Sequence, residues 1–90
     1  MENKIEIKTT EETYKGIYAN NAVVMHTEAE FILDFMSIFP PKGLLGARLI
    51  MTPGTMKRVT LAMQENLARY EQQYGEVKLA KAPDPQTFTH

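Results

Sequence analysis

The sequence predicts a small α+β domain, with a four-stranded antiparallel meander sheet followed by one long C-terminal helix packed on one face. Three observations predict it. Short segments rich in β-branched and aromatic residues alternate with turn residues through the first half of the chain. A single helical periodicity then occupies residues 53–74. The chain has 90 residues, which is enough for one domain only.

The first predicted strand lies in the polar start of the chain. Ile5 and Ile7 alternate there with charged residues, a period of two that is typical of an edge strand guarded by lysines. A loose terminus is the alternative interpretation. We therefore expect residues 1–13 to form a polar N-terminal arm or an edge strand.

Two longer strands are predicted next, over residues 14–26 and 30–39. Asparagine is poor inside strands, so Asn20-Asn21 predicts a bulge or a bend in the first of them. In the second, apolar density is high at every spacing, which leaves a helix as the alternative. The phenylalanines and the Pro40-Pro41 stop favour a strand.

The rest of the domain is a loop, a strand and the helix. Prolines and glycines predict a loop over residues 40–46, and residues 47–52 form the fourth strand. Thr52 is a good N-cap, Pro53 a good first helical residue, and Gly75 a good terminator. The single domain is therefore expected over residues 14–76, with an extended or disordered tail over 77–90.

The predicted helix has one apolar face, which we expect to pack on the sheet. At about 100° per residue, that face holds Met56, Val59, Met63, Leu67, Tyr70 and Tyr74. Leu61 lies roughly opposite, either as an ordinary exposed leucine or as a second, shallow contact with another subunit. Asn66 lies at the edge of the apolar face, either as a wetted boundary residue or as a paired asparagine that fixes register between subunits.

One helix covers only one face of such a sheet. The second face still carries apolar side chains, and either the tail or another copy of the chain must cover them. The tail is too polar to be the better candidate, so we expect a homo-oligomer, either a dimer or a dimer of dimers. The candidate interface residues are Ile32, Met36, Ile38, Leu61 and Asn66.

Composition narrows the possible partners and cofactors. The chain has no cysteines and two distant histidines, so disulfides and thiolate metal sites are excluded, and no metal or cofactor is expected. Ten basic and eleven acidic residues are interspersed, without the basic block typical of nucleic-acid binding. A modest candidate basic strip consists of Arg48, Lys57, Arg58 and Arg69. No apolar run approaches the ~20 residues of a bilayer span, and a cytoplasmic setting is expected.

Motifs for catalysis are missing from the sequence. It contains no nucleophile elbow, no phosphate-binding glycine loop and no paired-histidine ligand spacing. Asp34 and Arg48 are expected to pair across adjacent strands as a structural pair. We therefore predict a non-enzymatic, homo-oligomeric interaction module that binds a protein or peptide. A small nucleic-acid-binding accessory protein is the alternative.

Several segments in order resemble a known family. They are IYANNAVVMHT, EFILDFMSIFP and ARLIMTPGTMKRVTLAMQENLARYEQQYG. Together they resemble the uncharacterised prokaryotic family named domain of unknown function 3467, over roughly residues 14–76. The resemblance implies a short antiparallel sheet followed by a long helix, and it implies no activity or catalytic residues. The predicted architecture is also similar to that of SecB-type export chaperones, which are dimers of dimers, although their second helix is missing here.

Overall fold

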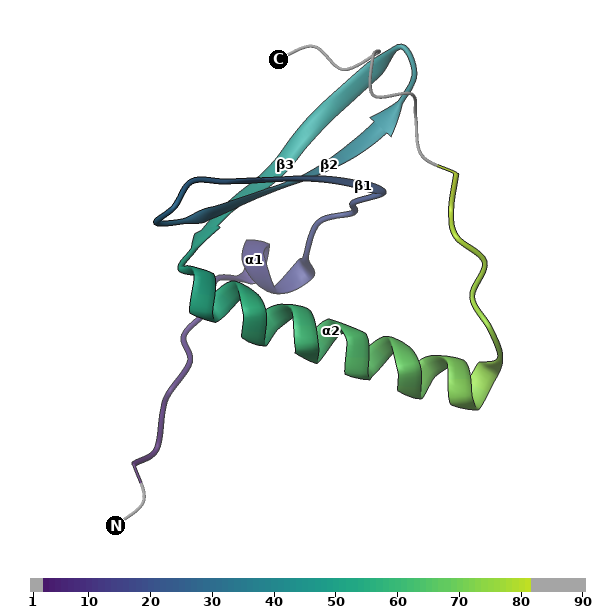
Figure 1. Cartoon of the computed structure of the whole chain (residues 1–90). Coiled ribbons are helices and arrows are strands. Elements are labelled where there is room, and N and C mark those ends of the chain that lie inside the picture. Colours follow the sequence, from purple (N-terminus) through teal and green to yellow (C-terminus); the bar gives the residue numbers. More distant parts are fainter. Residues whose placement is uncertain (1–2, 82–90) are drawn as a thin grey trace.

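The computed structural model describes residues 3–81, which form an antiparallel sheet and two helices (Figure 1). The elements are, in chain order, α1 (Glu11–Lys15), β1 (Asn21–His26), β2 (Phe31–Phe39), β3 (Lys42–Met51) and α2 (Pro53–Tyr74). The sheet has three strands in the order β1-β2-β3. The predicted α+β class and the long C-terminal helix are confirmed.

The prediction of a fourth strand is wrong for the described part of the chain. Residues 4–8 form no strand, and α1 occupies the start of the segment predicted as the second strand. Thr10 caps α1, because its hydroxyl accepts a hydrogen bond from the Thr13 N–H at 3.1 Å. The negative charges of two glutamates in the first turn interact favourably with the helix dipole. Gly16, with φ of 78°, ends the helix. These local capping interactions outweigh the β-propensity of Tyr14 and its neighbours.

Asn20 forms a bend just ahead of β1, which is one of the two predicted alternatives, and its side chain binds the backbone of β2. The Ile38 N–H donates to Oδ1 of Asn20 at 2.8 Å, and Nδ2 of Asn20 donates to the Ile38 carbonyl at 3.0 Å. The Asn20 N–H also donates to the Met36 carbonyl at 3.1 Å. The asparagine side chain therefore extends the β1–β2 pairing by the same two bonds that a strand residue supplies.

The bulge lies instead in β3, at Gly46. The register shifts there, since Phe35 pairs with Ala47 and Met36 with Leu45. A Cβ added to Gly46 would lie 2.8 Å from Cδ1 of Ile17, so glycine allows that close approach.

The connection between β2 and β3 is shorter than predicted. Pro40 and Pro41 occupy the turn, where no ladder N–H is needed, and β3 begins directly afterwards at Lys42. Residues 42–46, predicted as a loop, pair with the end of β2. The two glycines of this segment suggested a loop, but they are accommodated by the bulge and by the hairpin end of the strand.

The helix α2 begins and ends as predicted. Its N-cap is Thr52, Pro53 is its first residue, and Gly75 follows its last residue with φ of 96°. Residues of its first two turns are half-buried: Thr55, Met56, Val59 and Thr60. No residue of this fully described helix is buried, and α2 diverges from the β2–β3 hairpin toward its C-terminal end, while α1 lies between the sheet and the first half of α2 (Figure 1). The predicted packing of the helix along one face of the sheet is therefore not seen, since half-buried side chains near the sheet are limited to the first two turns of α2.

Removing the N-cap hydroxyl of α2 is expected to destabilise the fold by about 1 kcal/mol. The Thr52 hydroxyl accepts a hydrogen bond from the Thr55 N–H at 3.3 Å, and alanine leaves that N–H without its acceptor. We expect Thr52→Ala to lower the free energy of unfolding measured in urea, and Thr52→Asn, which caps equally well, to retain it. If both variants lost the same unfolding free energy, the loss would not come from the capping hydrogen bond.

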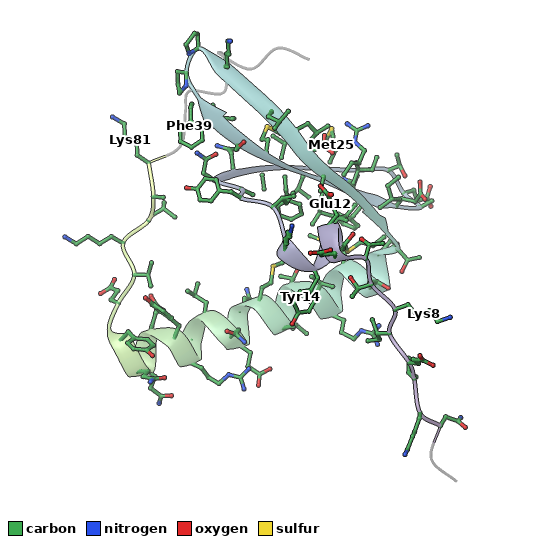
Figure 2. All side chains as sticks on the ribbon, turned by 180° about the vertical axis from the view of Figure 1, so that it is seen from behind. Lys8, Glu12, Tyr14, Met25, Phe39 and Lys81 are labelled. Carbon is green, nitrogen blue, oxygen red and sulfur yellow. The ribbon has the colours of Figure 1, made fainter. Side chains whose placement is uncertain are left out.

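The segments outside these elements have little regular structure. The N-terminal arm leads away from the sheet, as Lys8 shows in Figure 2. The boundary expected between the arm and the domain, at residues 13 and 14, falls inside α1. Residues 75–81 form no helix or strand, although the Val77 N–H donates to Oε2 of Glu71 at 2.9 Å. The remainder of the predicted tail, residues 82–90, lies outside the described residues. Neither described helix combines the length and hydrophobicity of a bilayer span.

Candidate functional site

The core of the described chain is very small. Its buried apolar residues are Leu33 and Met36, each 5% exposed, and both belong to the central strand β2. The only other buried residue in the described range is Asp34, which is 0% exposed. Within residues 3–81, a single chain therefore buries little more than the middle of one strand, and most of its large apolar side chains are exposed.

Asp34 and Arg48 form the cross-strand pair that the sequence predicts. They face each other directly in the β2–β3 register. Nε of Arg48 donates to Oδ1 of Asp34 at 2.7 Å, and one terminal nitrogen of the guanidinium donates to Oδ2 at 2.8 Å. These hydrogen bonds, and then the carboxylate charge, raise the pKa of the Arg48 guanidinium, while partial burial lowers it. The pair is bidentate, the strongest geometry for a carboxylate and a guanidinium.

Most of the exposed apolar side chains of the sheet lie on the outer strands β1 and β3, and Phe39 adds one at the end of β2. Ile32, Met36 and Ile38 share one sheet face, but Met36 is buried, and the two isoleucines are half-buried. The register places Met25 and Ile50 on either side of Ile32 on that face, 40% and 59% exposed. The opposite face also carries exposed apolar residues, namely Val24, Leu44 and Leu49.

The largest exposed apolar group on α2 is the second half of its apolar face. We call the four side chains of this group the α2 stripe, and their exposed fractions are 57% for Met63, 52% for Leu67, 51% for Tyr70 and 67% for Tyr74. The two tyrosine rings lie against each other, with centroids 4.9 Å apart. The sequence predicted that these side chains would pack on the chain's own sheet. The structure leaves them exposed, and sequence reasoning missed them as a surface.

The two helix residues proposed as interface candidates lie on different sides of α2. Both are exposed, Leu61 by 56%. At about 100° per residue, Asn66 borders the α2 stripe, whereas Leu61 faces roughly the opposite direction. One flat partner therefore cannot contact both residues at once.

The candidate basic strip is divided between two elements. Arg48 lies on β3 and is bound to Asp34, whereas Lys57, Arg58 and Arg69 lie on α2. Arg58 and Arg69 share a side of the helix but are about 16 Å apart along it. Among residues 3–81, no three histidine, cysteine, aspartate or glutamate side chains are grouped so as to hold a metal ion.

The fold and its surface define a class: a small α+β domain with a three-stranded antiparallel sheet, a long C-terminal helix and little core of its own. The chain belongs to the family described as protein of unknown function (DUF3467), whose family model matches residues 1–79. The resemblance seen in the sequence is thereby confirmed. No curated protein matches the chain. No solved structure matches it either, so the architectural similarity to SecB-type chaperones receives no support from solved structures.

Proposed function

We propose that the chain is a non-enzymatic, homo-oligomeric protein-interaction module. The observation that carries this proposal is the imbalance of burial in residues 3–81: two apolar residues are buried, and nineteen large apolar residues are exposed. A domain of this size has a marginal core even when it is compact. The radius of gyration is 16.2 Å, compared with about 12 Å for a compact chain of this length. A further copy supplies the missing burial.

The kind of residue exposed also supports protein binding. Aromatic residues and methionines, which are enriched at the centres of protein interfaces, are exposed both on the sheet and on α2. Phe39 lies close to the tip of the β2–β3 hairpin (Figure 2), where its ring stacks on Tyr18 with centroids 6.2 Å apart. Met63 and the tyrosines of the α2 stripe lie on the helix. Methionine adapts its shape to varied partners, which suits a module that binds a protein or a peptide.

Oligomerisation is tested by sedimentation equilibrium over a dilution series, together with thermal unfolding at each concentration. We expect a dimer or a dimer of dimers, and a melting temperature that rises with protein concentration, because association stabilises the folded chain by mass action. A monomer at every concentration, with a constant melting temperature, would overturn the proposal.

The class of partner is tested on the same material. Titration with short apolar peptides, followed by fluorescence anisotropy, is expected to show binding that persists at high salt. A labelled oligonucleotide that binds at low salt and is released at high salt would instead favour the nucleic-acid alternative.

A further inference from the structure

We infer that the α2 stripe of one chain packs antiparallel against the α2 stripe of a second copy. The inference rests on the proposed homo-oligomer and names the surface that forms it. All four stripe residues are more than half exposed in the single chain. The half of α2 that carries them diverges from the β2–β3 hairpin (Figure 1), so the chain's own sheet leaves this surface free. The first half of α2, where Met56 and Val59 are half-buried, is already partly covered.

The spacing of the stripe is symmetric, which favours an identical partner. Successive members are separated by four, three and four residues, so the pattern reads the same in both directions. When two copies lie antiparallel, Met63 faces the partner's Tyr74, and Leu67 faces the partner's Tyr70. Each contact then joins a ring with a flexible or branched aliphatic side chain. Such mixed pairs fill space well, and the methionine sulfur makes favourable contacts with aromatic rings.

A parallel arrangement fits less well. It places each tyrosine on its own equivalent and Leu67 on the partner's Leu67, so that large residues meet large ones and small residues meet small ones. It also aligns the two helix dipoles, whereas the antiparallel arrangement opposes them.

The borders of the stripe suit a subunit interface. At about 100° per residue, Asn66 and Gln73 border one side, and Gln64 and Glu71 border the other. Three of these four are neutral amides, which hydrogen-bond across a polar rim without an unpaired charge. Glu65 and Arg69 point away from the contact, so their charges stay in water.

The pairing is tested by two substitutions of the same residue type. Leu67→Asp places a carboxylate in the stripe, and Leu61→Asp places one on the other side of α2 at nearly equal exposure, 56% against 52% for Leu67. We expect Leu67→Asp to raise the dimer dissociation constant by at least about 30-fold, and Leu61→Asp to leave it unchanged. Sedimentation equilibrium measures the constant, and circular dichroism confirms that each variant retains its helix.

The outcomes separate this inference from the proposed function. If the unmodified chain is a dimer and Leu67→Asp dimerises equally well, the stripe is not the interface, although the proposed homo-oligomer stands. Loss of the dimer in Leu61→Asp alone would also overturn the inference and place the contact on the opposite side of α2. A monomeric unmodified chain would overturn both proposals.

Orientation is tested by disulfide cross-linking, because the chain contains no cysteines of its own. Mixing Met63→Cys with Tyr74→Cys and oxidising is expected to give the mixed disulfide in the antiparallel arrangement. Equivalent positions are then about 16 Å apart along the helix, too far for a disulfide. If each variant instead cross-links only to itself, the helices are parallel and the inference fails, even when folding is unaffected.

Discussion

Replacing Arg48 with methionine is expected to destabilise the folded protein by about 3 kcal/mol, because the fully buried carboxylate of Asp34 then loses the guanidinium that holds both its oxygens. The counter-charge offsets a large part of the cost of removing this carboxylate from water. Chemical denaturation at a fixed protein concentration measures the loss. Arg58→Met is the matched control, since Arg58 is exposed on α2 and forms no ion pair with any residue in the range 3–81, and we expect it to change stability little.

The double variant Asp34→Val/Arg48→Met separates charge from packing. Replacing both partners removes the buried charge. Position 34 then carries a valine, the same residue type as Val23, its pairing partner on β1. We expect the double variant to recover most of the lost stability. If it is as unstable as Arg48→Met alone, the shape of the pair matters more than its charge.

The effect of pH on this pair follows from the direction of the Arg48 shift. The pKa of Arg48 is raised in the folded state by the hydrogen bonds to Asp34. Stability from such a shift is fully present below the pKa of the unfolded state, and it is lost only as the pH rises through the folded value. Both values lie far above neutral, so Arg48 stays charged throughout the physiological range.

Replacing Leu33 with alanine is expected to lower the free energy of unfolding by about 3 kcal/mol, because it opens a cavity beside the few side chains that are buried within residues 3–81. Leu33 is 5% exposed and lies between Val24 and Leu49 in the sheet register. A loss of this size is a large part of the total stability of a small domain. We expect a lower midpoint in urea and a lower melting temperature at matched protein concentration.

Leu79→Ala is the control for the core substitution. Leu79 is the same residue type but is 99% exposed in the segment after α2, so its truncation creates no cavity. We expect Leu79→Ala to leave the free energy of unfolding nearly unchanged, so that almost the whole loss is seen in Leu33→Ala alone. Similar losses in both would mean that Leu79 becomes buried in the assembled protein, and that the single-chain core is not the main source of stability.

The parts of this fold that the sequence predicted depend on short-range interactions. The cap at Thr52, the proline at position 53 and the glycine at position 75 delimit α2 correctly, since each acts on backbone groups within one turn. The strand over residues 30–39 was also predicted correctly apart from its first residue. The pairing of Asp34 with Arg48 followed from their opposite charges on neighbouring predicted strands.

The errors arose where several local signals compete. Residues 14–20 contain tyrosines and an isoleucine, which favour a strand. The Thr10 cap and the glutamates of α1 nevertheless make residues 14 and 15 helical, and Asn20 pairs with β2 through its side chain. Residues 42–46 contain two glycines and still form a strand, because the hairpin partner supplies their hydrogen bonds. The local sequence of residues 42–46 does not identify the strand with which they pair.

For the candidate interface residues, the sequence likewise predicted the local pattern but not the tertiary surroundings. Alternation placed Ile32, Met36 and Ile38 on one sheet face, and the register agrees. Alternation does not tell a central strand from an edge strand, and β2 is flanked on both sides, which buries Met36. The amphipathic pattern of α2 likewise identified an apolar face but not what it contacts.

By itself, the sequence determined the class of the fold, the ends of the long helix, the apolar face of that helix and the ion pair between Asp34 and Arg48. These features follow from periodicity, capping and charge, which act between near neighbours or directly opposed strand residues. Only the tertiary structure decided how many strands form, which apolar residues are buried, and that α2 leaves the sheet after its first turns. Those features depend on the direction in which each element leaves its neighbour, and the burial of a side chain depends on every element around it.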